Sequence, residues 1–307
     1  MRGASLILAL VLGGAWALTG CSSSDGGSGG SSGAGGQGGT TGMGGEGGEG
    51  GMGGTTGPTV SVGGIAWGFT LPGQGGYDLI KSATISVLEM PELSTETNDE
   101  GEFTIEGIPV GSQATFVLEH DRYPLTYTGT QTIPDEDITN LTFQVPNSGL
   151  YSVIEIQLGI TSDPEKCQMV STFTRYGRTI GDPGHHGQAG AVLTIDAPDG
   201  TSIEEGPIYF GDNVVPDRAR NYSSLDGGVL IVNADPGDYT LSASCVPNPS
   251  VLHDELVAEY PPMDYPEEDL RCETEDVVFE PVLMKCRPGV FLNASPSYGL
   301  QAFPPAE

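Results

Sequence analysis

Short runs in which apolar and polar residues alternate follow one another along the chain from residue 59 onward. In "SATISVLEM" the residues Ala83, Ile85 and Val87 share one face of an extended chain, and in "GEFTIEGI" Phe103 and Ile105 do the same. A period of two is typical of a strand that buries one face. Gly, Pro, Asn and Asp separate the runs, which favours a β-sandwich or barrel. We therefore expect an all-β fold.

The pattern repeats once, which indicates two related β units. Gly101 and Gly111 lie ten residues apart around the strand "EFTIEGIP", and Gly227 and Gly237 lie ten apart around "GVLIVNADP". The expected division of the chain is a first β-sandwich over 59–147, a connector over 148–165, a second, diverged sandwich over 166–297 and a C-terminal tail over 298–307. Each of the two units is long enough to bury its own core.

The segment "TNDEGEFTIEGIPVGSQATF" carries an acidic turn with glycine, a strand with an aromatic residue, and a Pro/Gly turn that leads into the next strand. The residues at these places are Asp99, Gly101, Phe103, Ile105, Pro109 and Gly111. This order resembles the carboxypeptidase regulatory-like family. The resemblance implies tandem transthyretin-like, or immunoglobulin-like, β-sandwiches. In metallocarboxypeptidases such a domain accompanies a catalytic domain and holds no zinc ligands itself.

The connector carries an apolar pattern that fits a helix. Behind Ser148, a candidate N-cap, the apolar residues at helical spacing are Leu150, Val153, Ile154 and Leu158. We expect a short helix packed between the two units. A strand is the alternative, because every second residue from 154 to 160 is also apolar.

The N-terminus is typical of an export signal. An uncharged apolar run follows Arg2, and it is shorter than the ~20 residues that a membrane-spanning helix needs. Its end, "LTGC", resembles the lipobox of bacterial lipoproteins, in which the thiol, here that of Cys21, receives a diacylglycerol before cleavage. We expect residues 1–20 to be a signal peptide. An ordinary signal peptide with an incidental cysteine is the alternative.

Residues 21–58 follow as a glycine- and serine-rich stretch with almost no aliphatic or aromatic residue. Such a stretch cannot bury enough apolar surface to offset its chain entropy, so a disordered linker is expected. Ser22 after the cysteine, by analogy with lipoprotein sorting, fits delivery to the outer membrane of a Gram-negative envelope.

The chain is strongly acidic, with 41 Asp and Glu against 11 Lys and Arg and a net charge of −30. A field of this sign repels phosphate backbones, which excludes nucleic acid as a partner. The expected partners are the membrane, through the lipid, and an extracellular protein or carbohydrate.

Apart from Cys21, the chain has four cysteines, and all lie in the second unit. An even count in an exported chain predicts two disulfides with three pairings to choose from. We favour Cys167 with Cys286, which ties the opening strand to the closing strand, and Cys245 with Cys272, which closes a proline- and acid-rich loop. Zinc is the competing explanation, but the C-x-x-C spacing is missing.

Metal-binding residues are the remaining candidates for chemistry. His185 and His186 are adjacent and stand in a glycine-rich turn. Intradiol dioxygenases resemble transthyretin-like sandwiches and hold iron partly through two histidines, but these are spaced H-x-H. Asp99, Glu100 and Asp212 lie in oxygen-rich turns of the kind that bind calcium. No phosphate-binding loop and no H-E-x-x-H is present in the sequence.

These observations favour a non-enzymatic surface lipoprotein that displays β-sandwich domains for binding or adhesion, or as a spacer. No cofactor is expected, apart from the calcium considered above. The alternative is a small metal-dependent enzyme or metal-binding protein on a transthyretin-like fold, in which His185 and His186 would hold the metal.

Overall fold

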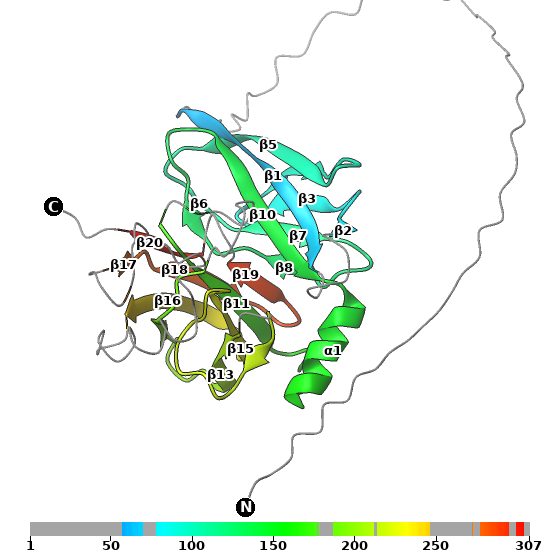
Figure 1. Cartoon of the computed structure of the whole chain (residues 1–307). Coiled ribbons are helices and arrows are strands. Elements are labelled where there is room, and N and C mark those ends of the chain that lie inside the picture. The colour runs from blue at the N-terminus through cyan, green and yellow to red at the C-terminus, as the bar shows by residue number, and fades with distance from the viewer. Residues whose placement is uncertain are drawn as a thin grey trace, which may run out of the picture. The chain divides into compact units, whose positions relative to one another are not determined.

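The computed structural model describes residues 57–69, 78–176, 178, 187–211, 214–245, 272, 277–294 and 299–303. Among these residues strands dominate, and one helix is present (Figure 1). The expected all-β, sandwich-like fold is confirmed.

The described residues of the first half form ten strands. They are β1 (Thr59–Phe69), β2 (Asp78–Leu79), β3 (Thr84–Val87), β4 (Met90–Glu96), β5 (Glu102–Pro109), β6 (Gln113–Ala114), β7 (Phe116–Glu119), β8 (Thr126–Tyr127), β9 (Gln131–Thr132) and β10 (Ile138–Pro146). Strand β1 pairs in parallel with β10 and antiparallel with β2 and β5, while β3 pairs with β4 and β7. These two sheets enclose a common core.

The alternation read from the sequence describes this first core well. Ala83, Ile85 and Val87 are fully buried in it, and so are Phe103 and Ile105, apart from a few per cent of their surface. Each strand therefore turns its apolar face inward, as a period of two requires.

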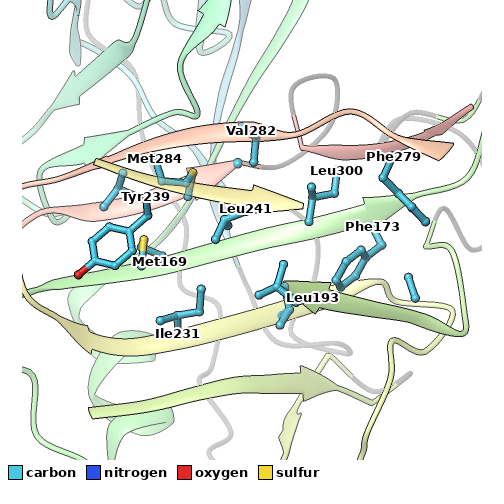
Figure 2. Close-up of a cluster of buried hydrophobic side chains, with 14 of the residues drawn as sticks. Met169, Phe173, Leu193, Ile231, Tyr239, Leu241, Phe279, Val282, Met284 and Leu300 are labelled. Atoms are coloured by element: carbon cyan, nitrogen blue, oxygen red, sulfur yellow. The ribbon is translucent and has the colours of Figure 1, made fainter. Parts of the chain in front are cut away.

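The second half begins after the helix. Its strands are β11 (Cys167–Thr174), β12 (Ala191–Asp196), β13 (Ile203–Phe210), β14 (Pro216–Asp217), β15 (Gly228–Ala234), β16 (Gly237–Cys245), β17 (Val278–Phe279), β18 (Val282–Cys286), β19 (Phe291–Ala294) and β20 (Leu300–Phe303). A sheet of β12, β16 and β18 packs against β11, β15 and β20, and Figure 2 shows side chains from both layers meeting. The expected C-terminal tail instead contains β20, which pairs with β11 and β17.

The two halves share one sheet. Its strand order runs β14-β13-β15-β11-β19-β8-β7-β3-β4, and the junction is the parallel pairing of β19 with β8 (Figure 1). Val117 and Tyr127 from the first half also belong to the core of the second half. The backbone hydrogen bonds and the apolar core therefore both continue across the junction, although the two sandwiches as separate domains stay a prediction.

Helix α1 (Ser148–Leu158) confirms the expected connector helix, and the strand alternative is wrong. The N-cap, however, is Asn147 and not Ser148: its Oδ1 accepts a hydrogen bond from the Leu150 backbone N at 2.9 Å. Gly159 ends the helix in the left-handed conformation, with φ of 63°.

The inner side of α1 packs on the outer face of β13 and β15. Leu158 and Ile154 contact a small cluster of side chains from this face, made of Ile208, Phe210, Leu230 and Val232. Val153 was expected on the packed stripe, but it is 47% exposed, because the sheet lies under Ile154 instead. Strand β15 is consequently buried on both faces.

Candidate functional site

Several predicted site residues lie outside the described residues. Cys21, His185, His186 and Asp212 are among them, so lipidation of the first and metal binding by the others stay predictions. Within the described part of the chain, no group of three or more His, Cys, Asp or Glu side chains is placed to hold a metal ion. None of the described helices has the length and apolar character needed to cross a membrane.

The acidic turn proposed for calcium is described at Asp99 and Glu100. Asn98 organises it, since its Oδ1 accepts from the backbone N of Glu100 at 3.0 Å and of Glu102 at 2.8 Å. The Asp99 carboxylate lies 3.6 Å from the Lys81 Nζ, and both side chains are largely exposed. Calcium binding here stays a prediction.

The four cysteines of the second half pair as the sequence favoured. Cys167 bonds to Cys286 with Cα atoms 5.6 Å apart, and Cys245 bonds to Cys272 with Cα atoms 5.1 Å apart. The first disulfide joins β11 to β18, which lie in different layers. It therefore locks the two layers of the second half together.

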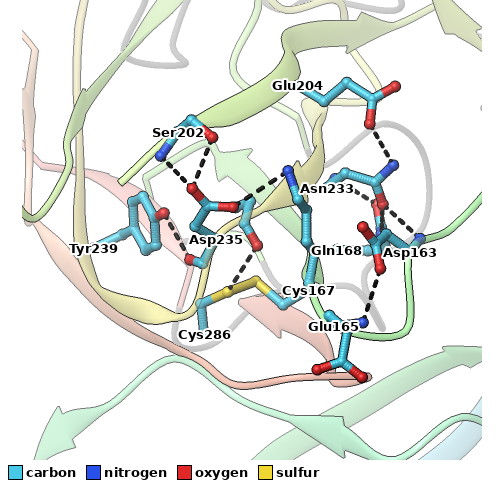
Figure 3. Close-up of polar contacts among 12 residues, drawn as sticks. Asp163, Glu165, Cys167, Gln168, Ser202, Glu204, Asn233, Asp235, Tyr239 and Cys286 are labelled. Carbon is cyan, nitrogen blue, oxygen red and sulfur yellow. Dashed lines mark hydrogen bonds and ion pairs between the residues drawn. A yellow bond between two sulfur atoms is a disulfide. The ribbon is translucent and has the colours of Figure 1, made fainter. Parts of the chain in front are cut away.

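A buried polar cluster lies beside this disulfide (Figure 3), with Asn233 at its centre. The Asn233 Oδ1 accepts from the Gln168 Nε2 at 2.5 Å and the Asp163 backbone N at 3.0 Å, while its Nδ2 donates to the Thr161 carbonyl at 3.0 Å and to Glu204 at 2.8 Å. All donor and acceptor positions of this amide are used. The cluster thus fixes the chain after α1 onto β15 and β13.

Asp235 fastens the other side of the same region. It accepts hydrogen bonds from the Ser202 backbone N and Oγ at 2.8 and 2.7 Å, and its carboxylate lies 3.2 Å from the Lys166 Nζ. The bonds from Ser202, followed by that from Lys166, hold the pKa of the Asp235 carboxyl below its usual value. This carboxylate therefore links Ser202, which precedes β13, to Lys166, which precedes β11.

A large cleft opens where the first half meets the second. We call it the polar cleft; its volume is about 610 Å³. Strands β6 and β9 and the start of β10 line one side, and β18, β20 and the residues before β18 line the other. Amides, hydroxyls and carboxylates dominate the lining, contributed by Gln113, Thr130, Gln131, Thr132, Glu136, Asp137, Thr139, Asn140, Glu280 and Gln301.

The walls of the polar cleft are held by contacts between the two halves. The Thr130 backbone N donates to the Leu283 carbonyl at 2.7 Å. Close by, the Glu89 carboxylate accepts from the Lys285 Nζ at 2.5 Å and from the Thr115 backbone N at 2.8 Å. Burial raises the pKa of Glu89, but the bonds from Lys285 and Thr115 outweigh burial and leave the pKa lowered.

Gln131 provides an unusual group in this cleft. Its Nε2 is fully buried and has no hydrogen-bond partner. A buried amide donor without a partner costs about 1–3 kcal/mol, so native proteins rarely keep one. Because Gln131 also lines the cleft, a turn of its side chain toward the cleft would let this group donate to an incoming acceptor atom.

A second cavity lies beneath α1. We call it the apolar pocket; its volume is about 140 Å³, and its walls are mainly aliphatic and aromatic. The large side chains that line it are Phe69, Tyr151, Val170, Phe210, Leu230 and Phe291. Tyr151 packs edge-on against Phe291 with ring centroids 6.0 Å apart, and its hydroxyl is 2.8 Å from the Ser162 Oγ. Burial, helped by nearby Glu155 and opposed by Ser162, raises the pKa of Tyr151 to about 12, which keeps the phenol neutral.

Sequence reasoning missed both cavities. Gln131 lies in a strand of two residues, too short to show an alternation, and Gln144 lies between Phe143 and Val145 in β10, so neither was singled out from the sequence. The sequence signal that could have pointed to the cavities is the presence of two amide residues, Gln131 and Gln144, in strands that also contain threonine. Their burial depends on layers supplied by residues more than a hundred positions away.

Comparison with known proteins adds little to this geometry. No protein family and no curated protein matches the chain, so the resemblance to carboxypeptidase regulatory-like domains stays a prediction. Among solved structures, the Bacillus anthracis TIE protein is similar at 12% identity with a TM-score of 0.24. The match covers 78% of this chain and 33% of the TIE protein, so this chain spans about a third of the length of the TIE protein.

Proposed function

We propose that this protein is a non-enzymatic, lipid-anchored component of the cell envelope whose β body binds a neutral, polyhydroxylated ligand, a carbohydrate, in the polar cleft. The observation that carries the proposal is the cleft itself. Its volume of about 610 Å³ falls within the range typical of ligand sites, and amide and hydroxyl groups dominate its lining.

The chemistry of the lining suits sugar hydroxyls. An amide both donates and accepts hydrogen bonds, and so does each hydroxyl of a sugar, whereas an ionised carboxylate only accepts. Glu136, Asp137 and Glu280 would accept from sugar hydroxyls, and their charge would repel acidic sugars. With its side chain turned toward the cleft, the Gln131 Nε2, which has no partner in the structure, would gain an acceptor from a ring or hydroxyl oxygen of the sugar.

Preformed walls support ligand binding in the polar cleft. The Thr130 to Leu283 bond and the Glu89 to Lys285 ion pair hold both sides of the cleft before any ligand arrives. Binding to a rigid site loses less conformational entropy than binding to a mobile one. The same rigidity suits a body that presents one fixed surface outward.

The anchoring part of the proposal rests on the lipobox-like "LTGC" and the linker that follows Cys21. Stable attachment takes two acyl chains or more, which a lipoprotein cysteine carries. A glycine-rich linker of this length would give an average separation of roughly 35 Å between membrane and body. Cys21→Ser should move the protein from the membrane fraction to the soluble fraction, and an unchanged distribution would end this part of the proposal.

A glycan array probed with the purified full chain tests the ligand class. Neutral glycans should bind, and sialylated or uronic acid glycans should bind at least tenfold more weakly. Titration of a bound glycan should then show about a tenfold loss for Gln131→Leu, which corresponds to one hydrogen bond of about 1.4 kcal/mol. Gln157→Leu, at an exposed helix position, is the matched control. Equal affinity of both variants, or no glycan bound at all, contradicts the proposal.

A further inference from the structure

The apolar pocket results from incomplete covering of a sheet face. Val170 of β11, Phe210 of β13 and Leu230 of β15 lie on the outer face of the shared sheet. The C-terminal half of α1 covers part of this face through Leu158 and Ile154. Nearer to the start of the helix, a space of about 140 Å³ is left between Tyr151, the sheet and the end of β1.

The volume of the apolar pocket limits the size of the ligand that it can hold. An apolar cavity of about 150 Å³ stays free of water and holds one benzene molecule. The rings of Phe69, Phe210 and Phe291 contribute to the walls and offer edges and faces for contact with another ring. One aromatic ring therefore fills the pocket, and a two-ring system does not.

One polar group in the pocket lacks a partner. Gln144 is 8% exposed, and it points away from the first core because Phe143 and Val145 on either side of it are buried there. Within the described residues, no hydrogen bond of its side-chain amide is found, and the Asn293 Nδ2 donates to its backbone carbonyl at 2.6 Å. Because this amide has no partner among these residues and lines the pocket, it favours a ligand that carries a donor and acceptor atom.

Other polar atoms around the pocket are already engaged. The Gln168 amide is paired with Asn233 through both of its ends, at 2.5 and 2.9 Å. The Glu155 carboxylate accepts from the Ser162 backbone N at 2.8 Å, and Asp226 accepts from the Gly228 backbone N at 3.1 Å. Because these two carboxylates line the pocket, they would repel an anion.

We propose that the apolar pocket binds a free, neutral, single-ring aromatic molecule with one hydroxyl group, a simple phenol, whose ring lies among the aromatic walls and whose hydroxyl pairs with the Gln144 amide. A phenol hydroxyl both donates and accepts, so it can satisfy either end of the amide. This site is distinct from the polar cleft, with which it shares no lining residue.

Calorimetric titration of the purified full chain with phenol and with toluene tests the proposal. The two molecules have the same size and differ in the hydroxyl that Gln144 would bind. Phenol should bind with a dissociation constant on the order of 1 mM or tighter and raise the melting temperature, as ligands of the native state do. Toluene should bind about tenfold more weakly, and benzoate, an anion, should not bind measurably.

Two variants separate the ring contacts from the hydroxyl contact. Gln144→Leu should weaken phenol to the level of toluene while toluene binding stays, and Gln157→Leu on the exposed side of α1 should change neither. Val170→Phe should fill the pocket and remove both ligands. Circular dichroism establishes that each variant is folded. The proposal is overturned if phenol and toluene bind equally to the native chain. It is also overturned if neither binds at a ligand concentration of about 10 mM, tenfold above the expected dissociation constant, or if Gln144→Leu keeps the preference for phenol.

Discussion

Asn233→Asp changes one NH₂ group into an oxygen at the centre of the buried polar cluster and leaves the shape of the side chain unchanged. Asn233 has a positive φ of 49°, a conformation that Asp also tolerates, so the backbone has no reason to move. The variant loses both donated bonds, to the Thr161 carbonyl at 3.0 Å and to Glu204 at 2.8 Å. It also places a second carboxylate against Glu204.

The magnitude follows from these contacts. A bond to a neutral carbonyl contributes about 1 kcal/mol, and one to a charged group about 1.5–3 kcal/mol. Asn233 is 1% exposed, so the new charge would have little access to water. We expect the free energy of unfolding to fall by about 3–5 kcal/mol at pH 7.5, within the range seen when a buried charge lacks a partner.

The loss should depend on pH. Burial and the nearby Glu204 would raise the pKa of the new carboxyl in the folded state above the value of about 3.9 in the unfolded chain. The penalty is therefore fully present above the raised pKa and shrinks as the pH falls below it; it disappears only below about 3.9, where the carboxyl is protonated in both states.

Urea denaturation followed by tryptophan fluorescence measures the effect at pH 7.5 and pH 4.5. Asn98→Asp is the matched control, because Asn98 also donates from its Nδ2 to a carboxylate, that of Glu102 at 3.1 Å, but is exposed; the two bonds that its Oδ1 accepts from backbone N atoms are kept in Asp. This control should lose less than about 1 kcal/mol, as exposed substitutions do. Equal losses for the two variants, or a loss for Asn233→Asp that is the same at both pH values, would show that a buried charge beside Glu204 does not cause the destabilisation.

Three further predictions concern contacts that fix the fold. Glu89→Gln should lower the free energy of unfolding by about 1–2 kcal/mol at pH 7. Because the pKa of Glu89 is lowered in the folded state, its stabilisation is present above pH 4.5 and is lost as the pH falls further. The urea midpoints of the variant and the native chain should therefore converge below pH 4.5. Removing the Cys167–Cys286 disulfide, which spans 119 residues, should cost about 1 kcal/mol more than removing Cys245–Cys272, which spans 27, in paired serine variants compared by urea denaturation. Asn147→Ala should cost about 1 kcal/mol in the same assay through loss of the helix cap, whereas Ser148→Ala should cost less than half of that.

Local sequence patterns predicted the elements and the inward faces of the strands. The alternation at Phe103 and Ile105 was enough to assign which side chains enter the first core, because a strand has only two faces. The cysteine pairing was also within reach, because it followed from which segments open and close the second half.

Contacts between distant segments were beyond such reasoning. Strand β8 has two residues, and nothing in "TY" indicates that it pairs with β19, more than 160 positions later. In β10, Gln144 lies between Phe143 and Val145, on the opposite face, and only the second layer over that face leaves it 8% exposed. The sequence prediction placed the helix cap at Ser148, whereas the backbone that leaves β10 makes Asn147 the N-cap.

Mass spectrometry of the N-terminal peptide, from protein isolated out of the membrane fraction of a Gram-negative host, tests whether a lipidated Cys21 holds the binding body at the membrane. We expect a mature chain that begins at Cys21 and carries a diacylglycerol on the thiol with a further acyl chain on the amine. A chain that begins elsewhere, or a Cys21 with an unmodified thiol, would contradict this expectation.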